Sequence, residues 1–177
     1  MTTQTMTAPT RAASTQRMMT EPELERWLLD NMHALFQGRE AYKRIQRQFF
    51  FSISMDPVVA EVCNQKRYEW YQENLPVAPD ADLRLRVVAK VILSDVSRFD
   101  MRDWHVPVRD AQHQVCGTAH CIAGWTEVLG GEPAQTAIGM YGIPHEVLGA
   151  ALLGPDAMLH FYDTNDQALE YLRGLED

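Results

Sequence analysis

The middle of the chain carries a group of side chains that can bind a metal ion. His105, His113, Cys116 and His120 follow the pattern H-x7-H-x2-C-x3-H. Imidazole nitrogens and thiolate sulfurs are ligands that zinc prefers, although this spacing is not that of a standard zinc finger. The pattern therefore suggests zinc as a cofactor. The simpler interpretation is that the protein has no cofactor and that these side chains are structural.

Two of these residues belong to a distinctive segment, CGTAHCIAGW, which occupies residues 116–125 and holds two of the three cysteines of the chain. From Gly117 to Gly130 the sequence combines small residues with bulky apolar ones such as Ile122, Trp125 and Leu129, a pattern typical of a closely packed core helix. We expect this motif helix to run from about Thr118 to Leu129. A helix start as early as Cys116 would place Cys116 and His120 on one helix face. Cysteine is among the most buried residue types, so burial of Cys121 is the simplest expectation.

Thiol chemistry is a second hypothesis for the same segment. Cys116 could act as a nucleophile with His120 as its base, near the amino end of a helix that would stabilise the thiolate. His120 and Cys121 are less suitable partners, because neighbours on a helix point about 100° apart. A redox pair of Cys116 and Cys121 is strained inside a helix, and it requires Cys116 to precede the first turn.

The segment also resembles a known sequence pattern. FDMRDW at residues 99–104, followed by CGTAHCIAGW and by the Leu148–Gly149 step, is similar to a C-x-T-x-H-C-x-A-G-W motif of small uncharacterised bacterial and phage-borne domains. The resemblance covers about residues 97–154. It implies no known activity, cofactor or partner.

Charge and composition restrict the class of protein. With 46% apolar residues among 177, the chain can bury a core, and its net charge is −8. From Asp110 onward the sequence contains ten acidic residues and only one basic residue, Arg173. An acidic surface of this kind disfavours nucleic acid and favours a protein partner with a basic surface. No apolar run is long enough to span a membrane and the first residues lack a secretory pattern, so we expect a cytoplasmic protein without a membrane partner.

Several exposed-looking side chains could form a partner surface. Large aromatic residues of the kind that dominate protein interfaces are one group, and acidic residues near the carboxyl end are another. A basic stripe on one predicted helix could contact nucleic acid, or could pair with the acidic third of this chain or of a second copy in a homo-oligomer. The aromatic and acidic candidates are Trp70, Tyr71, Trp104, Asp163, Asp166 and Glu170, and the basic face is Arg39, Lys43, Arg44 and Arg47.

Apolar periodicity and helix-capping residues predict an all-α fold, a compact bundle of about seven to nine helices. We expect a disordered tail over 1–19, an N-terminal helical region over 20–76 and a motif-centred helical core over 77–177, with the last two packed as one domain. The first predicted helix begins at Thr20 and ends at Gly38, and two more cover about 39–50 and 57–73. A fourth starts at Asp80. After the motif helix, further helices are predicted to start near Pro133, Pro144, Pro155 and Thr164. Residues 87–93, VVAKVIL, contain enough β-branched side chains that a strand is an alternative to a helix there. Residues 97–115 are expected to form a long ordered loop, with a short hairpin as an alternative.

These observations together predict a non-enzymatic cytoplasmic protein-interaction or regulatory module. Its specific form would be an inhibitor of the phage or mobile-element type that presents an acidic surface. The alternative is a metal-dependent or thiol-dependent site built on the four candidate ligands, which keeps an enzymatic role open.

Overall fold

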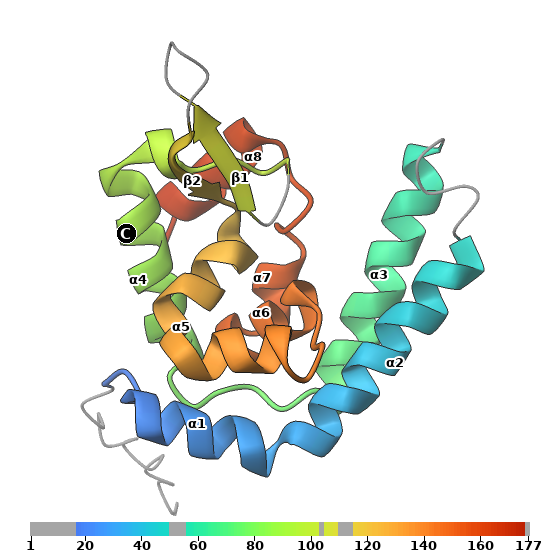
Figure 1. Ribbon diagram of the computed structural model, residues 1–177. Helices are drawn as coiled ribbons and strands as arrows, with labels where there is room; N and C mark the ends of the chain where they lie inside the picture. Colours follow the sequence, from blue (N-terminus) through green and yellow to red (C-terminus); the bar gives the residue numbers. More distant parts are fainter. Residues whose placement is uncertain (1–16, 50–55, 103–104, 110–114, 176–177) are drawn as a thin grey trace, which may run out of the picture.

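The computed structural model describes residues 17–49, 56–102, 105–109 and 115–175. Within these residues the chain forms eight α-helices, one 3-10 turn and one two-stranded antiparallel sheet (Figure 1). The predicted all-α bundle and its number of helices are therefore confirmed, and the hairpin foreseen before the motif helix is present. The elements are α1 (Glu21–Asp30), α2 (Met32–Phe49), α3 (Pro57–Asn74), α4 (Ala81–Ser94), η1 (Val96–Arg98), β1 (His105–Arg109), β2 (Val115–His120), α5 (Ile122–Gly139), α6 (His145–Leu153), α7 (Pro155–Met158) and α8 (Asn165–Arg173).

The first helix begins where its capping residues predict, but it ends earlier than expected. The side chains and backbones of Thr20 and Glu23 form a reciprocal capping box at the start of α1. Asn31 then separates α1 from α2, and its side chain donates a hydrogen bond to the Trp27 carbonyl at 2.8 Å. An asparagine side chain that bonds the preceding turn competes with the helical backbone, which explains the break at this residue.

Gly38 was predicted to end a helix, and this prediction is wrong because α2 continues through it. A Cβ atom placed on Gly38 would lie 2.9 Å from Cγ1 of Val147 in α6 and 3.2 Å from Cδ1 of Leu75. The glycine therefore serves the close approach of α2 to its neighbours, which the sequence pattern alone does not distinguish from a helix end.

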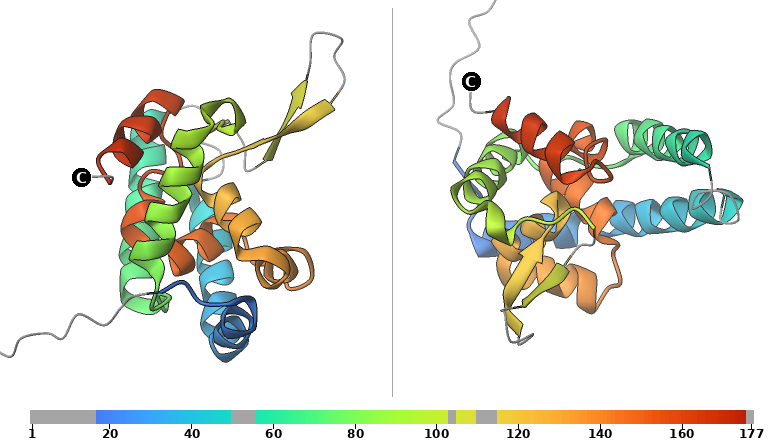
Figure 2. Two further views of the ribbon diagram at one scale, coloured as in Figure 1. Left: turned by 90° about the vertical axis from the view of Figure 1, so that its left-hand side faces the viewer. Right: turned by 90° about the horizontal axis from the view of Figure 1, so that it is seen from above.

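The second and third helices form an antiparallel pair that extends away from the remaining helices (Figures 1 and 2). Asp56 caps α3 at the predicted helix start, and its carboxylate accepts a hydrogen bond from the Val58 N–H at 2.9 Å. The proline-containing connection that follows α3 contacts the core, because the Ala78 N–H donates to the Ala151 carbonyl in α6 at 2.8 Å. The base of the pair is thus attached to the helix at the centre of the molecule.

The β-branched segment 87–93 is helical, so the strand alternative is wrong. It lies within α4, where Val88, Ala89 and Ile92 are buried. Because these side chains recur at helical spacing against α5, α6 and α8, tertiary packing overrides the weak β preference of the segment. The same helix carries a buried ion pair, in which Arg84 donates to the Asp80 carboxylate at 2.9 Å.

The motif helix begins later than predicted. Residues 115–120, expected in part as helix, form β2, and α5 starts only at Ile122. Cys121 is the N-cap in an extended conformation, and its Sγ accepts a hydrogen bond from the Gly124 N–H at 3.3 Å. Pairing with β1 satisfies the backbone of β2, which a helix over the same residues would have to satisfy within itself.

The glycine pair at residues 130–131 bends this helix. Gly131 has φ +62°, a left-handed conformation that favours glycine, and α5 changes direction there before Pro133. The predicted helix end at the glycines and the predicted new start near Pro133 thus correspond to a kink. The second part of α5 lies alongside α1 (Figure 1).

At the centre, α6 is buried from Glu146 to Leu153 and packs closely on the first part of α5. A Cβ atom on Gly149 would lie 2.8 Å from two ring carbons of Phe161 and 3.2 Å from Cβ of Ala123. Gly149→Ala should therefore reduce the free energy of unfolding by about 1–3 kcal/mol, since the buried phenyl ring has to move. Urea unfolding followed by circular dichroism measures the effect.

A matched substitution provides the control for this prediction. Gly139 lies at the end of α5, and a Cβ atom there would meet nothing within 4 Å. Gly139→Ala should leave stability unchanged or raise it by up to about 1 kcal/mol, because alanine favours the helix over glycine. Equal losses in the two variants would show that the close approach at Gly149 is not what limits stability.

The hairpin of β1 and β2 extends from the helical core (Figure 2), with His105 paired to His120 at its base. At the carboxyl end, α8 begins at the predicted position, where Thr164 and Gln167 form a capping box. Residues 1–16 of the predicted tail lie outside the described residues, whereas the Met19 N–H donates to the Asp80 carboxylate at 2.8 Å. None of the helices in the described part of the chain is long and apolar enough to cross a membrane.

Candidate metal centre

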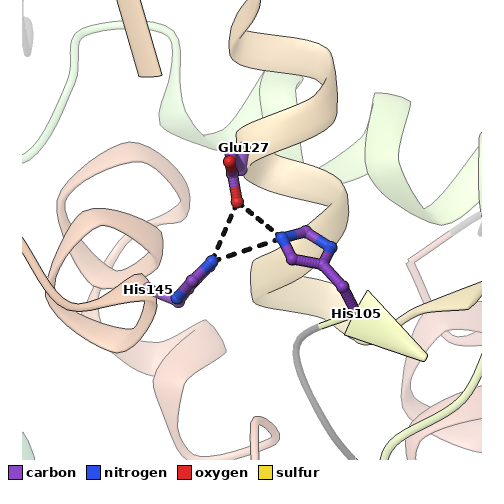
Figure 3. Close-up of side chains that lie close together, drawn as sticks. All are labelled: His105, Glu127 and His145. Atoms are coloured by element: carbon purple, nitrogen blue, oxygen red, sulfur yellow. Dashed lines mark hydrogen bonds and ion pairs between the residues drawn. The ribbon is translucent and has the colours of Figure 1, made fainter. Parts of the chain in front are cut away.

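Three side chains from different elements converge on one point. His105 comes from the start of β1, Glu127 from the second turn of α5 and His145 from the first position of α6 (Figure 3). The ring Nε2 atoms of both histidines and one carboxylate oxygen face each other. Two imidazoles and one carboxylate are the protein ligand set of many catalytic zinc sites and of non-haem iron sites.

The distances within this cluster are close to those of a metal ligand set. Oε2 of Glu127 lies 2.6 Å from Nε2 of His105 and 2.8 Å from Nε2 of His145, and the two Nε2 atoms are 3.3 Å apart. Ligands held about 2.0–2.1 Å from a tetrahedral zinc ion are separated by about 3.3 Å. The three donors therefore need to move apart by less than about 1 Å to admit an ion.

The cluster is partly accessible to solvent. The side chains of His105, Glu127 and His145 are 33%, 17% and 18% exposed. Structural zinc sites are enclosed by four protein ligands, whereas sites that activate water keep a position open. Three ligands with one accessible side correspond to the open type.

A second histidine supports the first. Nδ1 of His105 lies 2.5 Å from Nδ1 of His120, its partner in the strand register. Histidines that bind metals usually use their other ring nitrogen in a hydrogen bond that fixes the ring orientation. Burial, with the charges of His105 and Arg98, lowers the pKa of His120 to about 4, so this ring is neutral near pH 7.

Trp125 forms the wall behind His120. The two rings meet edge to face with centroids 5.0 Å apart, and the Arg98 guanidinium lies 5.2 Å from the centre of the indole ring. The indole is 5% exposed, and its N–H finds no acceptor among the residues that the structure describes. The tryptophan of the motif thus holds the supporting histidine in place from the first turn of α5.

His145, the third candidate ligand, is positioned by the residue that follows it. Glu146 is completely buried, and its carboxylate accepts hydrogen bonds from Tyr71, at 2.8 Å, and from Tyr162. The carboxylate also forms an ion pair with Arg67, whose Nε lies 3.3 Å from Oε1. Burial raises the pKa of Glu146, and the Arg67 charge opposes this shift. These contacts fix the start of α6 against α3, and with it the position of His145.

The structure brings two of the four predicted metal ligands together. His105 and His120 are in contact, but His120 serves His105 rather than the ligand cluster. His113 lies outside the described residues, and Cys116 lies in β2, where only its backbone is described. The prediction that Cys116 and His120 share a helix face is wrong, because both belong to a strand.

Sequence reasoning missed Glu127 and His145. Glu127 lies two residues beyond the motif on a helix of apolar character, and His145 lies near no other predicted ligand in the sequence. His145 follows Pro144 at a helix start, which is a weak signal without the tertiary contact. The expected burial of Cys121 is confirmed, since the residue is 1% exposed and caps α5.

The predicted partner residues are distributed differently than expected. Tyr71 is completely buried against Glu146 and offers nothing to a partner, so its assignment to a surface is wrong. Trp70 is half-buried in a groove between α2 and α3, and Trp104 lies outside the described residues. Asp166 and Glu170 are exposed on α8, while Asp163 is in contact with His160 at 2.8 Å.

The predicted basic face lies on α2, and its contacts are mostly local. Arg39 and Lys43 form ion pairs with Glu40, and Arg39 also donates to the Tyr141 carbonyl at 3.1 Å. Arg44 and Arg47 are exposed and form no ion pair with another described residue. Pairing of this face with acidic side chains of the carboxyl-terminal third is not present in the described part of the molecule.

The fold and site define a mainly helical protein with a histidine–carboxylate cluster at the base of a short hairpin. Comparison with known proteins gives no match, whether to a family model, to a curated protein or to a solved structure. The resemblance of residues 97–154 to small bacterial and phage-borne domains therefore stays a prediction.

Proposed function

We propose that this protein binds a divalent transition metal ion, zinc in the first instance, at His105, Glu127 and His145. The observation that carries the proposal is the convergence of three ligand atoms from β1, α5 and α6 within 3.3 Å of one another. The contact of His120 with the outer nitrogen of His105 supports it, because it is the kind of second contact that metal-binding histidines make.

The accessible side of the cluster indicates what chemistry a bound metal ion would support. Zinc held by three protein ligands keeps a position for water, lowers the pKa of that water and polarises bound carbonyl or phosphoryl oxygens. The residues of this chain contribute orientation: His120 fixes the His105 ring, and the Glu146 network fixes the start of α6. The proposal thus favours the metal-dependent alternative, but only His105 of the four expected ligands binds the ion, together with Glu127 and His145, while His120 supports His105.

Titration with Zn²⁺ tests the proposal directly. Protein treated with chelator and then dialysed should bind one Zn²⁺ per chain in isothermal titration calorimetry. His145→Ala and Glu127→Gln should each raise the dissociation constant by about 100-fold or more, since loss of supporting contacts alone costs about 10–100-fold. His120→Ala should fall within that supporting range.

The control is His33→Ala, because His33 is exposed on α2, lies outside the metal cluster and forms a hydrogen bond only with Gln37 among the described residues. This variant should bind Zn²⁺ as the unchanged protein does. Without a metal ion, His105, His120, Glu127 and His145 can instead form hydrogen bonds among their ring nitrogens and the carboxylate. Absence of binding, or binding that His145→Ala leaves unchanged, would establish that arrangement and overturn the proposal.

The expected cellular location and role are separate proposals. The buried free thiol of Cys63 in α3 is compatible with a reducing compartment and supports the cytoplasm. The expected regulatory or inhibitory role toward a protein with a basic surface stays a prediction, as does a homo-oligomer.

A further inference from the structure

A groove near the carboxyl end of α5, away from the motif at its amino end, suggests a protein partner. It has a volume of about 250 Å³ and lies between α1 and the second part of α5. None of its lining residues belongs to the metal cluster. The lining residues are Glu21, Pro22, Glu25, Leu28, Leu29, Met32, Glu132, Pro133, Thr136 and Tyr141.

The floor of the groove is apolar and part of it is uncovered. Leu29 on α1 is 54% exposed, and Met32 and Tyr141 are half-buried beside it. Because Leu29 is about half exposed, part of the favourable free energy of burying a leucine side chain is not realised. The groove therefore gains stability if another apolar side chain covers it.

The rim of the groove is acidic. Glu21, Glu25 and Glu132 line it, and none of the three carboxylates forms an ion pair with another described residue. The Glu21 carboxylate lies close to the backbone at Gly131, where a Cβ atom would lie 2.3 Å from its Oε1. Arg39 reaches the Tyr141 end, but Glu40 and the Tyr141 carbonyl already hold its guanidinium.

Size and charge together select the kind of occupant. Small-molecule sites usually measure about 300–1,000 Å³, so this groove suits one or two inserted side chains better than a drug-sized ligand. Three carboxylates repel the phosphates of nucleic acids and of acidic membranes and attract lysine and arginine. We infer that the groove docks a basic amphipathic helix of another protein, whose apolar side chains enter between α1 and α5 while its cations meet the acidic rim.

Peptide binding tests this inference without reference to zinc. The probe is a fluorescent synthetic peptide of about five helical turns, with leucines along one face and lysines flanking them. Its comparison peptide carries glutamate in place of every lysine. Fluorescence anisotropy should show binding of the lysine peptide and none of the glutamate peptide.

Variants locate the binding surface. The double variant Glu25→Lys/Glu132→Lys should weaken binding at least about tenfold, because both rim charges are reversed. Glu61→Lys/Glu73→Lys changes the net charge equally on exposed positions of α3 and should leave the dissociation constant within about twofold. Leu29→Ser, which changes no charge, should also weaken binding, about fivefold or more.

Three results would overturn the inference. Equal weakening by both charge variants, or no effect of Leu29→Ser, would mean that the peptide is attracted by overall charge and does not enter the groove. Dimerisation of the protein alone, measured by sedimentation and abolished by Leu29→Ser, would mean that a second copy occupies the groove. Thermal unfolding of each variant confirms that the fold is retained before binding is compared.

Discussion

Arg67→Met should destabilise the protein by about 3–5 kcal/mol, because it leaves the Glu146 carboxylate buried without its cation. Arg67 is 5% exposed and its guanidinium lies over the rings of Tyr42 and Tyr162, at 5.3 Å and 5.2 Å from their centres. Methionine fills part of this space but supplies no charge. The free energy of unfolding in urea, followed by circular dichroism, measures the loss.

A second substitution separates lost charge from lost packing. Adding Glu146→Gln to Arg67→Met removes the isolated charge, while the amide can still accept the Tyr71 hydrogen bond. The double variant should recover about 1–3 kcal/mol relative to the single one. Lys90→Met, an exposed position of α4, should change stability by no more than about 0.5 kcal/mol. If the double variant is as unstable as Arg67→Met, the ion pair does not carry the effect.

Trp125→Ala should cost about 3–5 kcal/mol, comparable to the loss at Arg67, because it opens a cavity where the indole packs against His120. The side chain belongs to the hydrophobic core formed with α4 and α6. Denaturant unfolding of the variant and of the unchanged protein under identical conditions gives the difference.

Trp125→Phe is the informative companion. It keeps an aromatic ring against His120 and removes an indole N–H that has no acceptor among the described residues. We expect a loss of about 1.5 kcal/mol or less, because a buried donor without a partner contributes nothing favourable. A loss as large as that of alanine would indicate that the indole N–H makes a contact with a residue outside the described ranges.

The sequence by itself determined the class of fold and most helix starts. Apolar spacing of 3.6 residues, together with side chains that cap their own backbone such as Asp56 and Thr164, acts within a few residues, so it can be recognised without the fold. Burial of Cys121 followed from residue type in the same way.

Tertiary structure decided the features that depend on distant partners. Gly38 continues a helix because Val147 and Leu75 lie against it, and residues 115–120 form a strand because β1 is available to pair with them. Tyr71 is buried in the core, where its hydroxyl donates a hydrogen bond to Glu146, a residue far along the chain. Local sequence is compatible with both outcomes in each case, and long-range packing selects one.

The candidate site shows the same division. His105 and His120 were identified from residue type and proximity in the sequence, and the strand register brings them together. Glu127 and His145 join them only because α5 and α6 pack closely at Gly149, which places the second turn of one helix beside the first residue of the other. Ligands contributed by separate elements leave no spacing pattern in the sequence, so only the packed structure reveals the set.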